Sequence, residues 1–470
     1  MPDYDLAVIG AGAAGLSVTA AAAQLGLRVA LIERGQMGGD CLNAGCVPSK
    51  ALLAAAHAAT EAGRAGRFGI RLSPPEIDWD RLRAHVKGAI AAIAPMDSEA
   101  RYRALGATVL RAEARFVAPD ALMVDGSRLT ARRFVVAAGS RPTMPPIPGL
   151  DAAEPLNNET LFERLPRPEH LLVLGGGPVG LEMAAAHAAL GCRVTLIEQA
   201  RIAAQEDPEL ADLLRVELRR LGATVREGVA VVSASRGPVL HLANGTRIEG
   251  SHLLVATGRR PNIEALGLDA ADVAFGPRGI ATDAGLRSTT NRRAFAAGDI
   301  ADPAGLGPRA FTHAAGYHAS VIVRRAVFRL PARLDYRALP RVLYTAPELA
   351  QVGLTEAEAR AAGHDVRVLR WPLAENDRAI AERDTAGLVK LVAARGRLLG
   401  AGILAPHAGE LIGQWTLAVA SRMRLSALAG LIAPYPTRAE AGKRAAGSAF
   451  LVTLFSPRVR AAARLLARLP

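Results

Sequence analysis

The fold is decided by residues 5–33, which read DLAVIGAGAAGLSVTAAAAQLGLRVALIE. An apolar strand runs into Gly10, Gly12 and Gly15, an Ala-rich helix follows, and a second strand is closed by Glu33. The glycines allow a tight turn and the close approach of a pyrophosphate, the helix N-terminus supplies positive potential, and the carboxylate accepts ribose hydroxyls. The stretch therefore predicts a dinucleotide site.

The same pattern occurs a second time. The strand of residues 171–174 leads into Gly175, Gly177 and Gly180, and the strand of residues 193–197 is closed by Glu198 at the same interval. Both copies also end alike, in FVVAAGSRP at residues 134–142 and LLVATGRRP at residues 253–261. A single glycine pattern is weak evidence, but an internal repeat with all its parts in register predicts two dinucleotide sites.

Composition narrows the class of protein. The chain has 470 residues, half of them hydrophobic, which excludes a disordered protein and predicts more than one domain. No apolar run approaches the roughly 18 residues of a spanning helix, and the first residues do not form a signal peptide, so the cytoplasm is the expected compartment.

The chain is strongly basic, but its charge does not predict a nucleic-acid partner. The net charge is +13, only four of the 57 basic residues are Lys, and the arginines are spread along the chain, which is typical of a GC-rich genome. In the tail, Arg460, Arg464 and Arg468 recur at helical spacing beside leucines. We expect a terminal helix packed on a partner subunit, with peripheral membrane contact as the less favoured alternative.

Three cysteines, Cys41, Cys46 and Cys192, are too few for a disulfide framework. The close pair Cys41 and Cys46 has no His nearby to complete a zinc site, so redox chemistry is favoured and no metal site is expected. Cys46 and Lys50 are spaced i, i+4 on the first turns of an expected helix. There the helix dipole and the cation favour a thiolate at Cys46.

Further motifs follow in order along the chain. They are GGDC at residues 38–41, CVPSK at 46–50, ATGR at 256–259, FAAGD at 295–299 and YTAPE at 344–348. Together with the two glycine patterns, these residues resemble the class I pyridine nucleotide-disulfide oxidoreductases, the family of dihydrolipoamide dehydrogenase, glutathione reductase and mercuric reductase. The resemblance covers nearly the whole chain.

The resemblance implies an α/β fold with two Rossmann-like dinucleotide-binding domains, for FAD and NAD(P), and a C-terminal α+β dimerisation domain that builds a homodimer. The implied FAD domain has a first part at residues 1–148, with the redox-active disulfide, and a second part at residues 268–338. The NAD(P) domain is expected at residues 149–267. The interface domain, with the basic tail, is expected at residues 339–470.

The resemblance also implies which residues hold the cofactors. For FAD these are Gly10, Gly12, Ala13, Ala14, Gly15, Glu33, Arg34, Gly39, Asp40, Lys50, Ala114, Ala138, Gly139, Ser140, Asp299, Thr312, His313 and Ala314. For the pyridine nucleotide they are Gly175, Gly177, Pro178, Val179, Gly180, Glu198 and Gly258. Glu198 would accept from a ribose 2′-hydroxyl and repel a 2′-phosphate, so NADH is expected, while the nearby Arg201 keeps NADPH as the alternative.

The implied catalytic residues are Cys41, Cys46, Lys50, Glu182, Tyr435 and Glu440. A hydride from the nicotinamide would pass through the flavin to the Cys41–Cys46 disulfide. Cys46 would then face the flavin as a charge-transfer thiolate, Cys41 would attack the substrate, and Lys50 would pair with Glu182 near the flavin.

One segment departs from the dithiol enzymes of this family. Where they place a catalytic His, residues 434–440 have Tyr435, and no His follows His407. A phenol with a pKa of about 10 is a poor base at neutral pH. Tyr435 and the following Glu440 instead resemble mercuric reductase, although the vicinal cysteines that close that enzyme are missing here.

Three functions therefore stay open from the sequence. The first is a mercuric-reductase-like oxidoreductase. The second is a dihydrolipoamide-dehydrogenase-like enzyme in which Tyr435 only packs, and the third is a flavin-based redox-sensing or binding protein. The acceptors that fit a direct approach to Cys41 are a small disulfide, a thiol-ligated metal ion and a quinone.

Overall fold

The computed structural model describes residues 1–469, which fall into two compact units. Unit 1 comprises residues 1–56, 76–175 and 231–336. Unit 2 comprises residues 57–75 and 176–230, and continues from residue 337 to the end of the described chain.

Unit 1 is built around a seven-stranded sheet in the order β3-β2-β1-β6-β5-β4, with β18 also paired to β6. Strands β1, β2, β3, β6 and β18 are parallel, whereas β4, β5 and β6 form an antiparallel meander. The strands are β1 (Tyr4–Ile9), β2 (Val29–Ile32), β3 (Thr108–Leu110), β4 (Ala114–Ala118), β5 (Ala121–Val124), β6 (Ser127–Val136) and β18 (Ala294–Ala296).

The parallel strands are apolar because both faces of the sheet are covered. Val8 of β1 is fully buried between its neighbours Leu31 and Val135. Helix α1 (Ala13–Gln24) packs against α9 (Thr312–Ile322), and its contact with β1 depends on Gly15, where a Cβ atom would lie 1.8 Å from the Gly10 carbonyl oxygen. This close packing brings the start of α1 to the carboxyl end of β1.

Unit 1 contains further helices. They are α2 (Gly39–Asn43), the start of α3 (Cys46–Arg64), α4 (Trp79–Ile93), α5 (Glu99–Ala104) and α6 (Asn158–Arg164). The remaining strands are β7 (Ser140–Pro142), β8 (His170–Leu174), β11 (Val231–Ser235), β12 (Val239–Leu242), β13 (Arg247–Glu249), β14 (His252–Val255), β15 (Arg259–Pro261), β16 (Phe275–Gly276), β17 (Gly279–Thr282) and β19 (Ala301–Pro303).

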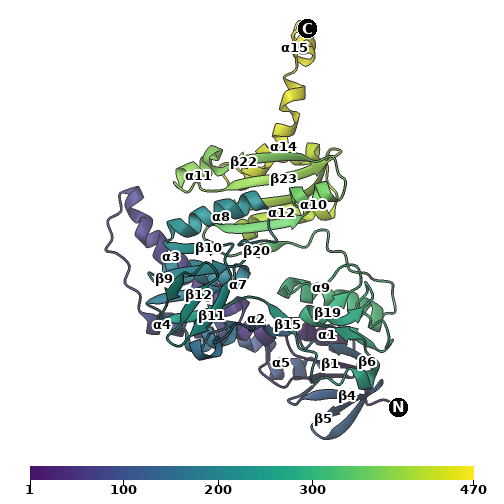
Figure 1. Cartoon of the computed structure of the whole chain (residues 1–470). Coiled ribbons are helices and arrows are strands. Elements are labelled where there is room, and N and C mark those ends of the chain that lie inside the picture. The colour runs from purple at the N-terminus through teal and green to yellow at the C-terminus, as the bar shows by residue number, and fades with distance from the viewer. Residues whose placement is uncertain (470) are drawn as a thin grey trace. The chain divides into compact units, whose positions relative to one another are not determined.

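Unit 2 contains a five-stranded antiparallel sheet in the order β20-β21-β24-β23-β22, with α12 and α14 packed on it (Figure 1). The strands of unit 2 are β9 (Arg193–Glu198), β10 (Ala223–Glu227), β20 (Arg341–Leu343), β21 (Glu348–Gly353), β22 (Arg367–Pro372), β23 (Leu388–Ala394) and β24 (Arg397–Ala405), and the last five form this sheet. Its helices are α7 (Pro178–Ala189), α8 (Pro208–Arg220), α10 (Glu356–Ala361), α11 (Asp377–Ala381), α12 (Ala408–Ala420), α13 (Leu425–Ala429), α14 (Ala439–Leu454) and α15 (Pro457–Leu466).

A buried ion cluster fixes α8 to the five-stranded sheet. The Lys390 side chain on β23 is 5% exposed, and its ammonium lies 2.9 Å from Asp207, 2.9 Å from Glu209 and 3.1 Å from Glu356. A buried ammonium is tolerated only when charges and hydrogen bonds compensate it, and three carboxylates do so here. The cluster thereby joins the segment after β9 to the C-terminal part of the chain within unit 2.

The elements predicted from the sequence are confirmed. Strands β1, β2, β8 and β9 flank the two glycine patterns, α3 begins at Cys46, and the Arg-rich tail forms α15. Within residues 1–469, no helix is both long enough and apolar enough to cross a membrane.

Candidate functional site

The turn formed by the first glycine pattern leaves the N-terminus of α1 without a side-chain cap. Gly10 has a φ of +104°, and a Cβ atom there would lie 2.4 Å from the Ala137 carbonyl oxygen, so only glycine fits. Gly12 has an ordinary φ of −86° and no atom closer to its Cβ position than Gly39 Cα at 3.9 Å, and it gives α1 no side-chain cap. The chain itself does not require glycine at this second position, so the space fits a pyrophosphate at the helix N-terminus.

Glu33 lies beside this turn in a fixed orientation. Its carboxylate accepts hydrogen bonds from the Ala11 and Gly35 backbone N–H groups, each at 2.6 Å. The remaining lone pairs fit the ribose hydroxyls of FAD. Arg34 pairs with Glu113 at 3.4 Å, next to Ala114 at the start of β4, so two further predicted residues lie in the same region of unit 1.

The second glycine pattern repeats this geometry. Gly175 has a φ of +114°, and its Cβ position lies 2.4 Å from the Ala256 carbonyl oxygen, which matches the relation of Gly10 to Ala137. Gly177 has no atom within 4 Å of its Cβ position, and α7 begins without a side-chain cap at Pro178. Glu198 accepts from Gly176 at 2.7 Å and Ala200 at 2.8 Å, as Glu33 does in the first copy. Gly177 and Glu198, which both lie in unit 2, therefore fit the phosphate and the ribose of a second dinucleotide.

Arg201, the residue that kept NADPH as the alternative, is paired with an acidic side chain. Its guanidinium donates to the Pro208 carbonyl oxygen at 2.5 Å and to Asp212 at 2.7 Å. Glu198, which lies beside this glycine turn, is negative. The local charge therefore favours a ribose hydroxyl over a 2′-phosphate.

The two close cysteines meet at the starts of two helices. Cys41 lies in α2, Cys46 is the first residue of α3, and both are free thiols in this structure. Cys46 Sγ lies 3.3 Å from Thr312 Oγ1, and Thr312 is the first residue of α9. The N-terminal ends of α3 and α9 stabilise negative charge at Cys46.

The two thiols are not equivalent. A hydrogen bond with Cys46, and then burial, raises the pKa of Cys41 above its ordinary value. Cys41 therefore keeps its proton at neutral pH and donates it toward Cys46. This asymmetry supports Cys46 as the thiolate and Cys41 as the thiol that awaits a substrate.

An ion network links the cysteine loop with the predicted flavin residues of unit 1. Arg259 contacts Asp40 at 3.2 Å and Asp299 at 3.8 Å, and donates to the Ser140 hydroxyl at 2.8 Å. That hydroxyl donates to Asp299 at 2.6 Å. Burial raises the pKa of Asp299. The sequence named Asp40, Ser140 and Asp299, but Arg259 only as part of a motif, and the structure shows it joining all three.

Other predicted FAD residues also lie in unit 1. Ala13 and Ala14 form the first turn of α1, and Ala138 and Gly139 follow β6 directly. His313 and Ala314 form the first turn of α9, and His313 stacks on Phe311 with ring centroids 5.3 Å apart. Of the nucleotide residues in the second copy, Gly258 follows β14, and Val179 is 37% exposed.

His318 is a site residue that sequence reasoning missed. The Gly298 N–H donates to its Nδ1 at 3.0 Å, and its Nε2 lies 2.6 Å from the Tyr336 hydroxyl. His318 is fully buried, and burial lowers its pKa to about 4. A neutral His318 thus fixes the backbone immediately before Asp299.

His318 predicts a specific acid sensitivity. The unfolded chain takes up a proton near pH 6.5, but the folded His318 stays neutral down to about pH 4, so its contribution is complete above pH 6.5 and is lost as the pH falls to 4. We expect this group to lower the free energy of unfolding by about 3 kcal/mol between pH 7 and pH 4. Urea denaturation of wild type and His318→Asn at both pH values measures it. An equal pH-dependent loss in both proteins would contradict this assignment.

Lys50 and Glu182 lie in different units. Lys50 is on α3 in unit 1. Glu182 is buried on α7 in unit 2, where it accepts a hydrogen bond from the Tyr344 N–H at 3.1 Å. Their ion pair remains a prediction.

Tyr435 lies on an exposed segment that is hydrogen bonded to the start of α11. Its side chain is 69% exposed, and its hydroxyl donates to Asp377 at 3.0 Å. This hydrogen bond raises the pKa of Tyr435, which makes the phenol a still poorer base at neutral pH. The segment is also tied down by Asn376, which donates to the Thr437 carbonyl oxygen at 3.0 Å, while Glu440 pairs with Arg444 at 3.1 Å.

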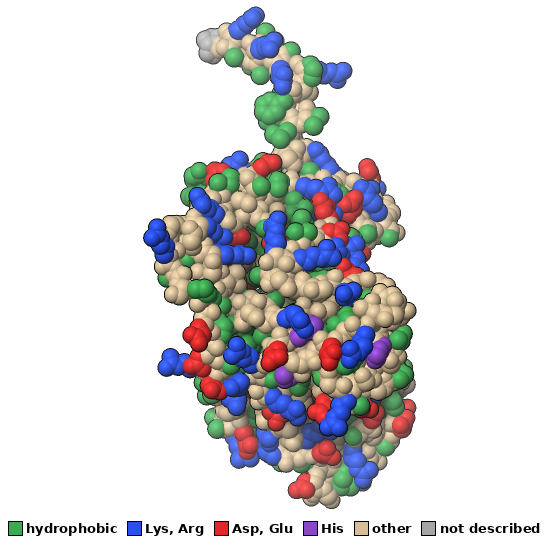
Figure 2. Space-filling view, turned by 60° about the vertical axis from the view of Figure 1, so that its left-hand side comes forward, with side chains coloured by type: hydrophobic (Ala, Val, Ile, Leu, Met, Phe, Trp, Pro, Cys, Tyr) green, Lys and Arg blue, Asp and Glu red, His purple; other side chains and the backbone are tan. Residues whose placement is uncertain are grey.

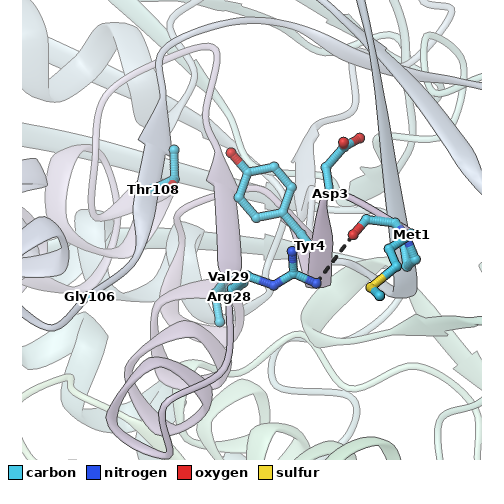
Figure 3. A pocket seen from close by; sticks show the side chains of 8 residues that line it. Met1, Asp3, Tyr4, Arg28, Val29, Gly106 and Thr108 are labelled. Atoms are coloured by element: carbon cyan, nitrogen blue, oxygen red, sulfur yellow. Dashed lines mark hydrogen bonds between the residues drawn. The ribbon is translucent and has the colours of Figure 1, made fainter.

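A cavity of about 450 Å³ lies elsewhere in unit 1 and is not the nucleotide site (Figure 3). The Arg28 guanidinium extends across this cavity and donates a hydrogen bond to the Pro2 carbonyl oxygen at 3.2 Å. Its lining residues Tyr4, Val29 and Thr108 are the first residues of β1, β2 and β3. Nucleotides bind at the carboxyl ends of parallel strands, and this cavity lies at the amino ends.

Comparison with known protein families places the chain. The family model described as "Pyridine nucleotide-disulphide oxidoreductase" matches residues 4–320, and the model of its dimerisation domain matches residues 339–446. The chain belongs to the pyridine nucleotide-disulphide oxidoreductase family. The predicted fold class is thereby confirmed, and the chain is an FAD-dependent NAD(P)H oxidoreductase that forms a homodimer.

Individual relatives cover almost the whole chain. A mercuric reductase from Streptomyces lividans is 40% identical over 94% of this chain and 95% of its own length. A dihydrolipoyl dehydrogenase from Thermus scotoductus is 36% identical over 94% and 96%. Among solved structures, the Cu(II) complex of the HOCl-induced flavoprotein disulfide reductase RclA from Escherichia coli is 26% identical with a TM-score of 0.83, and the match covers 93% and 98% of the two chains.

Proposed function

We propose that this member of the family passes an electron pair from NADH, by way of FAD and the Cys41–Cys46 disulfide, to a thiol-ligated soft metal ion, with Hg(II) as the leading candidate. The observation that carries the proposal is Tyr435. Its phenol donates to Asp377, and its raised pKa makes it unfit to remove a proton from a substrate thiol. Dithiol oxidation needs such a base, whereas metal reduction does not.

The two thiols have different roles, and the residues around them determine which thiol holds the negative charge and which holds the proton. When bound, FAD would supply the chemistry that links the nicotinamide to the Cys41–Cys46 disulfide. Cys46, at the starts of α3 and α9, holds the negative charge after reduction. Cys41 holds the proton, because its pKa is raised by the hydrogen bond with Cys46 and by burial. The dithiol therefore stores two electrons with one proton on Cys41.

A soft metal cation as acceptor removes the need for a catalytic base at Cys41. A thiol that coordinates such a cation is deprotonated by the metal itself, so no histidine is needed at Cys41. For a bis-thiolate complex the reaction balances as Hg(SR)₂ + NADH + H⁺ → Hg(0) + NAD⁺ + 2 RSH. The 40% identity to a mercuric reductase supports this acceptor, and the Cu(II) complex of the RclA neighbour supports metal ions more broadly.

The test compares acceptors on the same protein. FAD-loaded enzyme is assayed for anaerobic NADH oxidation with Hg(II) bis-thiolate, Cu(II), lipoamide and a quinone, and for NAD⁺ reduction with dihydrolipoamide. We expect kcat/KM for Hg(II) bis-thiolate to exceed that for either lipoamide reaction by on the order of 100-fold. Rapid dihydrolipoamide oxidation without metal turnover would instead establish the dehydrogenase function, which the 36% identical relative supports.

We also propose NADH as the nucleotide. Glu198 is fixed by two backbone N–H groups, and Arg201 is engaged by Asp212. We expect kcat/KM for NADH to exceed that for NADPH about tenfold, because the carboxylate repels a 2′-phosphate. Glu198→Gln keeps an acceptor for one backbone N–H but removes the charge, so the ratio should fall severalfold. A ratio unchanged in Glu198→Gln would contradict the charge argument.

The division of the chain and its compartment complete the proposal. The FAD domain is assigned to residues 1–148 and 268–338, the NAD(P) domain to 149–267 and the interface domain to 339–470. The repeated glycine geometry at Gly10 and Gly175 supports two nucleotide domains. A compartment that keeps thiols reduced, such as the cytoplasm, fits a chain with three cysteines.

A further inference from the structure

The C-terminal arm, defined as residues 447–469, lies beyond the matched dimerisation domain, which ends at residue 446. It contains the last turns of α14 and all of α15. The buried residues of α14 end at Ala449, and α15 has none. Figure 1 shows the arm leading away from the five-stranded sheet of unit 2. Unit 2 itself therefore does not cover these helical turns.

The arm exposes large apolar side chains. The end of α14 presents Phe450, Leu451, Val452, Leu454 and Phe455, which are 39% to 81% exposed. In α15 and the turn after it, Val459, Leu465, Leu466 and Leu469 are 37% to 65% exposed. At 3.6 residues per turn Val459, Leu465 and Leu466 fall on one side of α15, and Arg460 and Arg464 fall on the opposite side, while Arg458 lies next to the apolar residues. Apolar surface of this extent on a soluble enzyme indicates an interaction site.

The charge of the arm indicates which kind of partner it fits. The arm contains no Asp or Glu, but it contains Arg458, Arg460, Arg464 and Arg468. Figure 2 shows apolar side chains on the stretch of the arm next to unit 2, and basic side chains together with apolar ones at its outer end. Two arms from two copies would bring these cations together with no carboxylate between them, which disfavours arm-to-arm pairing. A partner surface that offers both apolar groups and negative charge can contact the apolar side and the arginine side of the arm together.

We propose that the C-terminal arm docks this enzyme on the surface of a bilayer that contains anionic lipid. The apolar side chains enter the boundary between headgroups and acyl chains, and the arginines contact lipid phosphates. Because no described helix can cross a membrane, the contact is peripheral. This inference is independent of the proposed acceptor, since it involves none of the residues of the redox site.

The test uses full-length, FAD-loaded protein and sedimentation with vesicles. Vesicles of phosphatidylcholine with phosphatidylglycerol are compared with pure phosphatidylcholine at low and high salt. The arm is tested by the triple variant Arg460→Gln, Arg464→Gln, Arg468→Gln and by the double variant Leu465→Glu, Leu466→Glu. A matched control removes the same charge from three exposed arginines elsewhere, Arg81→Gln, Arg128→Gln and Arg236→Gln.

The wild type and the control are expected to bind the phosphatidylglycerol vesicles in a salt-sensitive way. Each arginine near an anionic surface strengthens binding roughly fivefold, so the triple variant should bind roughly 100-fold more weakly. Bound flavin and NADH turnover without vesicles should be unchanged, which shows that the variants fold. The proposal is overturned if the wild type stays in the supernatant, or if both arm variants bind as tightly as the control. Loss of the homodimer in the leucine variant, with no vesicle binding by the wild type, would assign the arm to a second copy instead.

Discussion

Replacing Cys41 by serine is expected to lower NADH-driven reduction of Hg(II) bis-thiolate by on the order of 1,000-fold or more. Serine cannot form the disulfide with Cys46, and its hydroxyl is a poor ligand for a soft cation. The residue is partly buried and hydrogen bonded to Cys46, so it is the thiol whose proton the metal must displace. Steady-state turnover under anaerobic conditions, normalised to bound flavin, measures the loss.

Cys192 provides the matched control for this substitution. It is the remaining cysteine of the chain, and it lies between α7 and β9, in unit 2, whereas Cys41 and Cys46 lie in unit 1. Cys192→Ser should retain wild-type turnover within about twofold. If Cys41→Ser kept a substantial part of the wild-type rate, electrons would leave the flavin without passing through the cysteines.

Replacing Tyr435 by histidine is expected to raise dihydrolipoamide oxidation on the order of 100-fold near neutral pH. An imidazole with a pKa near 6.5 accepts a thiol proton, whereas the Tyr435 phenol has its pKa raised by the hydrogen bond to Asp377. Turnover of Hg(II) bis-thiolate should change only a few-fold, because the metal displaces the Cys41 proton itself. The ratio of the two kcat/KM values is therefore the measured quantity.

Tyr435→Phe separates catalysis from packing. It removes the hydroxyl and the 3.0 Å hydrogen bond to Asp377 but keeps the ring. We expect this variant to stay as poor in dihydrolipoamide oxidation as the wild type. Efficient dihydrolipoamide oxidation by the wild type, unchanged in both variants, would show that Tyr435 only packs and that another group moves the proton.

Local chemistry explains why much of the fold could be predicted. Gly10 and Gly175 need a left-handed backbone, and Glu33 and Glu198 need to follow at a fixed distance, so sequence spacing alone carries this information. Cys46 was predicted at a helix start, and α3 begins there. Each of these features depends on residues that are close in sequence, and the repeat supplied a second, independent copy.

The features that the sequence did not reveal depend on residues far apart in the chain. Lys390 is buried because Asp207, Glu209 and Glu356 converge on it from two other segments. His318 accepts a hydrogen bond from the Gly298 N–H, 20 residues away in the sequence, and no local pattern distinguishes it from an ordinary core histidine. The Arg259 network likewise joins three segments. Such groups are visible only once the chain is folded.

The most direct test of the account is an anaerobic NADH titration of the FAD-loaded protein, followed by its visible spectrum, in the wild type and in Cys46→Ser. We expect two-electron reduction of the wild type to yield a long-wavelength absorption band, from the Cys46 thiolate beside the flavin, and we expect this band to be absent in Cys46→Ser. Bleaching of the wild-type flavin without that band would show that the cysteines do not exchange electrons with it, and would contradict the proposed route through Cys41 and Cys46.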